Sequence, residues 1–275
     1  MFHPVFKLSD ALHNCIVPDF SFNIVQIGAG GNGGYLVQRL SKLLYSLSSQ
    51  NDKFYFNYQI VDGDRVEKTN LFRQPFIEQD LNQPKSQILA ERYDNAYEIP
   101  ILYKDDYIES SEDIEKIMRN NRHHMRWNIP ILLGCVDNNA TRQIMHEVFQ
   151  NTSTIIYIDS GIDSVDEEGS KESGYSGQVV CGVKIKGKEY LSPVGSIYPN
   201  ILKDKDTRLP TQACGEQVVY FPQRMQTNEV AALVMMGYLN TLLHDKEIVS
   251  HYTNFNARTM LIKPTYIAKE QLEYE

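Results

Sequence analysis

The sequence has no excess of positive charge and no long apolar run. Its 35 acidic and 27 basic side chains leave a formal net charge of −8 at pH 7, so broad electrostatic binding to nucleic acid or to an anionic membrane is not expected. No stretch reaches the roughly 20 apolar residues that a membrane-spanning helix needs. The first 20 residues also lack the pattern of a secretion signal. We therefore expect a soluble, cytoplasmic protein.

Cysteine is scarce, and its spacing excludes two common frameworks. The four cysteines, Cys15, Cys135, Cys181 and Cys214, are far apart and form no CxxC pair. Neither a zinc site nor a disulfide framework is predicted. Cys135 and Cys181 lie in apolar, strand-like stretches and are expected to be buried, as small hydrophobic residues usually are.

The remaining composition is that of a folded globular protein. With 42% hydrophobic and 23% charged residues, the 275-residue chain can bury a sizeable core. This length suits one large domain, or one core with an embedded subdomain, better than two equal domains. We therefore expect residues 1–275 to form a single domain.

Short apolar runs alternate with helical patterns in the first part of the chain. Residues 22–28, 54–62, 129–137 and 154–161 are typical of strands, and residues 35–47 carry apolar side chains at spacings of three and four. This alternation predicts an α/β fold: a Rossmann-like, mostly parallel sheet with flanking helices.

The pattern changes after residue 161. Residues 163–174 are charged or small, and we expect a mobile loop there. Residues 176–187 are typical of strands, residues 200–213 of a polar connection, and residues 228–243 of an apolar helix. We expect this part of the chain to continue the sheet as a smaller antiparallel half.

Three glycines follow the first predicted strand in a GxGxxG spacing. Gly28, Gly30 and Gly33 stand between this strand and the helix, where bare backbone amides can approach a phosphate group. Asp62 ends the second strand, where an acidic residue can accept hydrogen bonds from ribose hydroxyls. The arrangement predicts a nucleotide site. The alternative is that the glycines only allow the helix to pack closely on the sheet.

A polar segment directly after the second strand distinguishes between nucleotides. It carries these polar and charged residues: Asp62, Asp64, Asn70, Arg73, Gln74 and, a little later, Lys85. Hydride transfer needs little cationic assistance, whereas attack on an α-phosphate benefits from cations that neutralise the departing pyrophosphate. Arg73 and Lys85 suit that chemistry. For an isolated arginine or lysine, an ordinary ion pair in a solvated loop would be the simpler interpretation.

Two polar residues end the strand at 129–137. Asp137 and Asn138 lie at the carboxyl edge of the predicted sheet, where ligands of open α/β sheets usually bind. Asp137 could hold Mg²⁺ through a carboxylate oxygen. Either residue could also cap the helix that follows, and capping is compatible with metal binding.

Taken together, these segments resemble the ThiF/MoeB family of ubiquitin-activating-type adenylating enzymes, of the HesA/MoeB/ThiF superfamily. The segments GAGGNGG, DGDRVEKTNLFRQ, QPKSQ and CVDNNATR occur in the family's order and approximate spacing over residues 22 to about 150. Further on, SGYSGQVV, ACGEQ and NEVAALVMMGYL are similar to the family's later sheet segment, its crossover-loop cysteine and the apolar helix behind it.

The resemblance implies that ATP adenylates the C-terminal carboxylate of a small ubiquitin-like (β-grasp) protein, a sulfur-carrier protein or a peptide. Residues 22–160 would form the nucleotide-binding half, and residues 161–275 would bind the carrier and bear the crossover loop. The residues implied to bind the nucleotide are Gly28, Gly30, Gly31, Gly33, Asp62, Asp64, Asn70, Gln74 and Asn138. Arg73, Lys85 and Asp137 would be catalytic, with Asp137 coordinating Mg²⁺.

Cys214 is implied as the acceptor in a possible second step. It lies in a polar, proline-containing stretch where a thiol can be exposed enough to form a thioester or persulfide; a merely structural thiol is the equal alternative. The resemblance also implies a homodimer. Lys7 is the only lysine or arginine before Arg39, so we expect no N-terminal arginine to enter a partner's ATP site.

Two other functions remain open on the residues alone. An NAD-dependent oxidoreductase shares the first strand, glycine-rich loop and helix of the Rossmann fold. It would leave Arg73, Lys85 and Asp137 without an obvious task. A non-catalytic scaffold of the same family could keep the fold and bind ATP without turnover.

Overall fold

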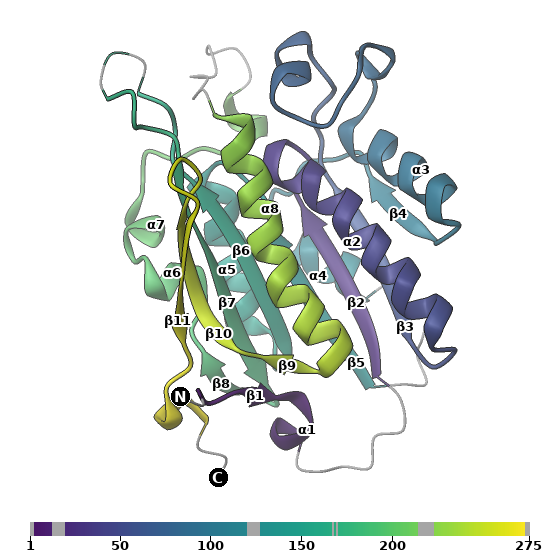
Figure 1. Ribbon diagram of the computed structural model, residues 1–275, viewed down its shortest axis with the longest axis vertical. Coiled ribbons are helices and arrows are strands. Elements are labelled where there is room, and N and C mark those ends of the chain that lie inside the picture. Colours follow the sequence, from purple (N-terminus) through teal and green to yellow (C-terminus); the bar gives the residue numbers. More distant parts are fainter. Residues whose placement is uncertain are drawn as a thin grey trace.

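A mixed nine-stranded sheet forms the centre of the molecule in the computed structural model (Figure 1). The residues that the structure describes are 3–12, 20–119, 127–166, 168, 170–213 and 223–272. Within them the strand order is β11-β10-β7-β6-β5-β2-β3-β4, with β8 beside β7. The mostly parallel sheet that continues into antiparallel strands is the architecture predicted from the sequence.

The parallel strands come first along the chain and the antiparallel strands follow. The parallel set is β2 (Phe20–Ile27), β3 (Tyr55–Val61), β4 (Ile101–Lys104), β5 (Trp127–Gly134) and β6 (Ile155–Ile162). The antiparallel set is β7 (Ser176–Ile185), β8 (Lys188–Leu191), β10 (Ser250–Asn256) and β11 (Leu261–Tyr266). A separate short pair joins β1 (Phe6–Lys7) to β9 (Glu247–Ile248).

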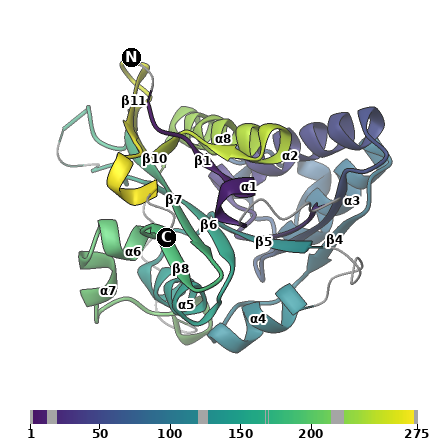
Figure 2. The same ribbon diagram turned by 90° about the horizontal axis from the view of Figure 1, so that it is seen from below.

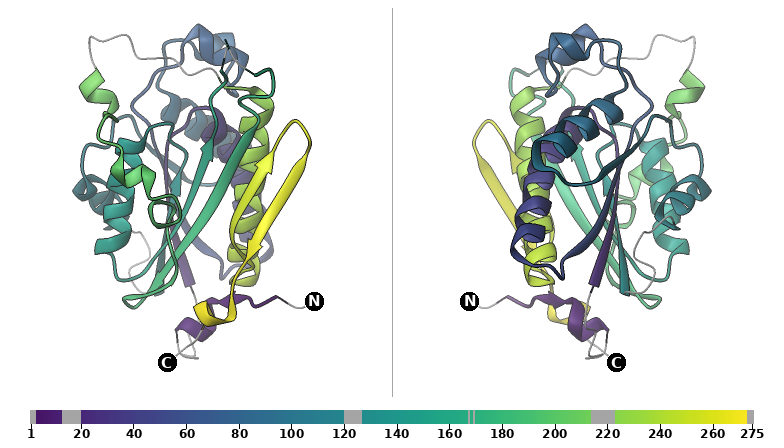
Figure 3. Two further views of the ribbon diagram at one scale, coloured as in Figure 1. Left: turned by 90° about the vertical axis from the view of Figure 1, so that its left-hand side faces the viewer. Right: turned by 90° about the vertical axis from the view of Figure 1, so that its right-hand side faces the viewer.

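Helices cover both faces of the sheet (Figure 2). One face carries α2 (Gly31–Gln50), α3 (Lys85–Tyr97) and α8 (Met225–Asn240), and the other carries α4 (Ser111–Arg119), α5 (Asn139–Asn151), α6 (Val194–Ile197) and α7 (Asn200–Lys203). The short α1 (Leu8–Ala11) follows β1. The β10–β11 hairpin lies beside α8 in both views of Figure 3. No described helix has the length and apolar character needed to cross a membrane.

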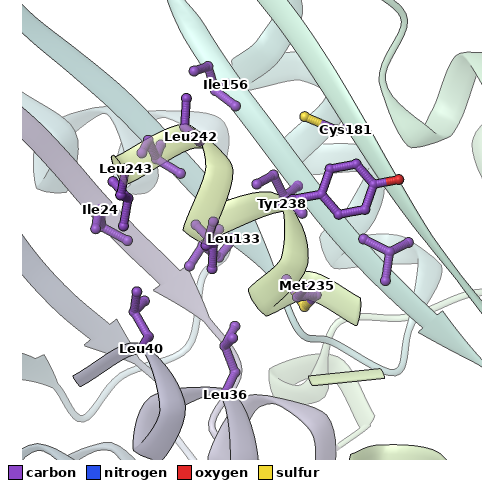
Figure 4. Packing of buried hydrophobic residues seen from close by; sticks show 14 of the residues in the cluster. Ile24, Leu36, Leu40, Leu133, Ile156, Cys181, Met235, Tyr238, Leu242 and Leu243 are labelled. Atoms are coloured by element: carbon purple, nitrogen blue, oxygen red, sulfur yellow. The ribbon is translucent and has the colours of Figure 1, made fainter. Parts of the chain in front are cut away.

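The hydrophobic core lies mainly between α2, α8 and the sheet (Figure 4). Leu36 and Leu40 of α2 face Leu133 of β5 and Met235 of α8, and all four are fully buried. Their spacing in the two helices places apolar side chains along the stripes that contact the strands. The predicted burial of Cys135 and Cys181 is confirmed.

The register places the carboxyl ends of three strands at one level. Ile27 at the end of β2 pairs with Val61 of β3 on one side and with Gly134 of β5 on the other. After β2 the chain builds β3 and β4 on one side, then crosses to form β5 and β6 on the other. Such a reversal leaves a crevice outside the carboxyl ends of the strands, where open α/β folds bind ligands.

Several predicted boundaries need correction. The strand expected over 129–137 ends at Gly134, because the chain turns into the loop before α5. Residues 200–213 are not merely a polar connection, since α7 and a 3₁₀ turn at Pro210–Ala213 lie within them. The helix expected from residue 228 begins at Met225. A π-helical turn, Thr241–Asp245, continues it.

Two leucines of α8 test the contribution of the core. Leu239 is fully buried and Leu233 is 52% exposed on the same helix. We expect Leu239→Ala to lower the free energy of unfolding by about 2 to 5 kcal/mol, because it leaves a cavity. Leu233→Ala should change it by no more than about 0.5 kcal/mol. Urea unfolding of both variants measures the difference, and equal losses would contradict this packing.

Candidate functional site

A cavity of about 820 Å³ opens at the carboxyl ends of the parallel strands. Most of the residues predicted for the site line it: Gly28, Gly30, Gly31, Asp62, Asp64, Asn70, Arg73, Gln74, Lys85, Asp137 and Asn138. Part of its wall is apolar, formed by Ile27, Val61, Ile108 and Val136. The cavity therefore combines polar groups with an apolar surface that suits a flat ring. Cys15 and Cys214 lie outside the described residues.

The glycine loop is shaped by close backbone contacts. Gly28 has a φ of +97°, and a Cβ there would lie 2.4 Å from the carbonyl oxygen of Cys135. A Cβ on Gly33 would lie 2.2 Å from the carbonyl oxygen of Gly28, so α2 can approach its own loop only with glycine there. Gly33 does not line the cavity, and its contact with a nucleotide stays a prediction.

Gly30 leaves the start of α2 open, whereas Gly31 packs against α8. A Cβ on Gly30 would make only an ordinary contact, 3.5 Å from Gln74, so the protein's own packing does not require glycine there. A Cβ on Gly31 would collide with Asn228 of α8, 2.1 Å from its Oδ1. The first amide groups of a helix have no intrahelical partner, and their dipoles favour an anion. A phosphate group fits this bare end.

Asp62 joins the glycine loop to the end of β3. Its Oδ2 accepts a hydrogen bond from the Ala29 amide at 2.6 Å, and its Oδ1 accepts one from the Asp64 amide at 2.8 Å. Burial raises the pKa of Asp62 to about 6, although the charge of Lys85 opposes this shift. Asp62 therefore stabilises the loop itself, a task that the sequence did not indicate.

Lys85 is held over the cavity by Asp64. Its Nζ donates to Asp64 Oδ2 at 2.8 Å, and the hydroxyl of Tyr107 donates to the other carboxylate oxygen at 2.6 Å. Burial alone would raise the pKa of Asp64, but Lys85 and these hydrogen bonds outweigh it and hold the pKa below its usual value. Asp64 is therefore an anion that fixes a buried ammonium group. Nothing in the sequence pattern indicated Tyr107.

Arg73, Asn70 and Gln74 belong to one turn beside the loop. Arg73 ends the 3₁₀ turn Lys68–Phe72, and its Nη1 donates to Gln223 Oε1 at 3.0 Å, across 150 residues of chain. Asn70 Oδ1 accepts from the Glu67 amide at 2.9 Å and so shapes the turn. Gln74 Oε1 is buried without a hydrogen-bond partner among the described residues. Gln223, which lines the cavity, could be found only from the structure.

Asp137 and Asn138 have different roles. Asn138 caps α5, because its Oδ1 accepts from the Thr141 amide at 2.8 Å. Asp137 is exposed at the cavity, and no hydrogen bond or ion pair involves its carboxylate within the described chain. The described residues contain no group of three or more His, Cys, Asp or Glu side chains placed to hold a metal ion. A single carboxylate fits Mg²⁺ that is also held by a ligand's phosphates, the usual arrangement for this ion.

Comparisons with known proteins agree with this fold. The model of the ThiF family matches residues 20–273. No curated protein matches the chain. Three solved structures illustrate the shared fold. E. coli MccB with ATP has a TM-score of 0.57 at 14% identity, covering 90% of this chain and 63% of MccB. MccB with AMPCPP and MccA has a TM-score of 0.57 at 15% identity, covering 90% and 64%.

PaaA is the third solved structure. It has a TM-score of 0.56 at 12% identity, covering 89% of this chain and 64% of PaaA. The chain thus spans less than two thirds of the length of each of these structures. At such low identity the likeness shows the fold.

Two identical substitutions test the close approach of α2 to its loop. In Gly33→Ala the new methyl group meets a backbone oxygen that cannot rotate away, so we expect a loss of about 1 to 3 kcal/mol in the free energy of unfolding. Gly237→Ala of α8 meets no atom within 4 Å. It should gain up to about 1 kcal/mol from helix propensity. Thermal unfolding distinguishes the two, and changes of the same sign would contradict the geometry.

The pKa of Asp62 predicts a pH dependence of stability. Its value of about 6 in the folded protein exceeds the ordinary value of 3.8, so the folded state binds the proton more tightly. The stabilisation of the folded state by protonated Asp62 is complete below the pKa of Asp62 in the unfolded chain, and it is lost as the pH rises through about 6. We expect the free energy of unfolding of wild type, minus that of Asp62→Asn, to fall between pH 4 and pH 7. Urea unfolding at each pH measures this difference, and a difference that stays constant from pH 4 to pH 7 would contradict the raised pKa.

Proposed function

Because the chain belongs to the ThiF family, as its motifs predicted, we propose that it uses ATP to adenylate the C-terminal carboxylate of a peptide or a small protein. One observation carries this proposal: the glycine loop, Arg73, Lys85 and Asp137 all converge on one cavity. The neighbouring structures include MccB with ATP and MccB with AMPCPP and MccA, which supports a nucleotide and a peptide as ligands of this fold.

In the proposed reaction a carboxylate oxygen attacks the α-phosphorus of ATP. The new bond forms an acyl adenylate, and the bond between the α-phosphorus and its bridging oxygen breaks to release pyrophosphate. The nucleophile is already ionised, so no side chain need remove a proton. Catalysis then depends on orientation and on neutralising the charge that moves to pyrophosphate.

The described residues suit these tasks. The open start of α2 would bind phosphate oxygens, and Asp62 would accept from the ribose through lone pairs that its two amide bonds leave free. Lys85 carries three donors, so it can keep Asp64 while it contacts a phosphate. Asp137 would hold Mg²⁺, which supplies additional positive charge at the phosphates.

The polypeptide would approach from the half formed by residues 161–275. Ile162, Ser164, Pro210 and Gln223 line the cavity from that half. A small ubiquitin-like or sulfur-carrier protein is the finer form of the proposal, and a free peptide is the alternative acceptor within it. Transfer to Cys214 and assembly as a homodimer stay predictions.

Pyrophosphate exchange into ATP tests the proposal. We expect exchange with Mg²⁺ and a carboxylate-bearing acceptor, taken either from β-grasp proteins ending in Gly-Gly or from short peptides. The same acceptors with an amidated C-terminus are the matched controls and should give none. Exchange with only one acceptor class would identify the substrate. ATP binding without exchange would favour a scaffold, and nicotinamide binding without ATP binding would favour an oxidoreductase.

Substitution of the two cations tests their roles. Lys85→Met and Arg73→Ala should each lower the exchange rate about 10²- to 10³-fold, the usual effect of removing one charge-stabilising donor. Lys116→Ala removes an exposed cation on α4, away from the cavity, and should leave the rate unchanged. Exchange rates equal to that of wild type in all three variants would show that Arg73 and Lys85 do not contribute to catalysis.

A further inference from the structure

Arg142 links three segments at the edge of the cavity. Its side chain starts in the first turn of α5, is almost wholly buried and lines the cavity. Its Nε donates to Asp159 Oδ1 at 3.0 Å, and its Nη2 donates to the carbonyl oxygens of Val136 at 2.6 Å and Ser160 at 3.1 Å. One guanidinium group therefore connects the loop after β5 to the end of β6.

The anion that holds Arg142 is itself fixed. Asp159 is 1% exposed, and its Oδ2 accepts from the hydroxyl of Tyr157 at 2.9 Å. A Cβ on Gly134, the last residue of β5, would lie 2.2 Å from this oxygen, so only glycine fits at that position. Burial alone would lower the pKa of Arg142, but the charge and hydrogen bond of Asp159, with Tyr157 and Asp137, together outweigh it and raise the pKa. The arginine is therefore a permanent cation with a defined orientation.

These contacts set the position of Asp137. The residue before it, Val136, is held at its carbonyl by Arg142, and the residue after it, Asn138, is held at its side chain by the Thr141 amide. The exposed Asp137 carboxylate makes no hydrogen bond or ion pair in the described part of the chain, although its charge contributes to raising the pKa of Arg142. Its carboxylate is placed by a backbone that is anchored on both sides.

We propose that Arg142 is a positioning residue that holds the Asp137 loop in the geometry needed for Mg²⁺ bound with the nucleotide. The inference rests on the proposed function. An arginine is required because its planar fork reaches acceptors on separate segments at once, whereas the single ammonium of lysine cannot do so in the same geometry. Partners behind a metal ligand commonly change metal affinity 10- to 100-fold when they are removed.

Lys184 is a control for the loss of hydrogen bonds from a buried cation to backbone carbonyl oxygens. It is also buried, and its Nζ donates to the carbonyl oxygens of Phe149 at 2.8 Å and Gln150 at 3.0 Å. These carbonyls end α5, whereas Arg142 lies in its first turn. Lys184 does not line the cavity. If Arg142 only stabilises the fold, then Lys184→Met and Arg142→Lys should behave alike.

The test measures how strongly Mg²⁺ enhances nucleotide binding to the full chain. Calorimetry gives the affinity for AMPCPP with and without Mg²⁺, and the ratio of the two affinities is the readout. We expect Arg142→Lys to lower this ratio about tenfold or more, while the affinity without Mg²⁺ changes less than about twofold. Lys184→Met should leave the ratio unchanged.

Two further variants separate positioning from a direct role. If Arg142 acts through Asp137, the variant carrying both Arg142→Lys and Asp137→Asn should lose no more of the ratio than Asp137→Asn alone. Asp159→Asn leaves Arg142 itself unchanged and removes the charge that orients it. This variant should also lower the ratio. Urea unfolding checks that each variant is folded.

The outcomes distinguish the two proposals. If wild type binds no nucleotide, the proposed function is wrong and this inference fails with it. If wild type responds to Mg²⁺ but Arg142→Lys and Asp159→Asn keep the wild-type ratio, only the role of Arg142 is wrong. An additive loss in the double variant would also overturn it, because Arg142 would then act independently of Asp137.

Discussion

The common level at which β2, β3 and β5 end is the constraint on which the rest of the site depends. Ile27, Val61 and Gly134 pair across three neighbouring strands, so the loops that follow them leave the sheet at one edge. The glycine loop, the Asp62 segment and the Asp137 loop therefore meet without any long connection. A slip of one residue in this register would reverse the faces of a strand and separate these loops.

Four carboxylates near this edge perform different tasks because their partners differ. Asp62 accepts from backbone amides, Asp64 pairs with Lys85, and Asp159 pairs with Arg142. Each of these three therefore orders the protein itself. Asp137 is left exposed with its oxygens available. This division explains how a chain with a net charge of −8 can still present cations to a phosphate.

Much of the fold and part of the site could be predicted from local patterns. The alternation of apolar runs with helical stripes predicts the parallel sheet, since each strand and helix must bury its own apolar side. The GxGxxG spacing identifies the loop, because the positive φ of Gly28 and the approach of Gly33 to the Gly28 carbonyl are demands that arise within a few residues of chain. Element boundaries were less accurate, as at Gly134 and Met225, where the loop geometry decides where an element ends.

The sequence by itself determined the family, the order of the elements and many of the residues that gather around one cavity, because these follow from local pattern and motif. Only the tertiary structure decided which groups pair: Arg73 with Gln223, Asp64 with Tyr107, and Arg142 with the carbonyl of Val136 and with Asp159. The pairing of Arg73 with Gln223 spans 150 residues. Such contacts depend on how distant strands and helices pack, and no local pattern of residues encodes that arrangement.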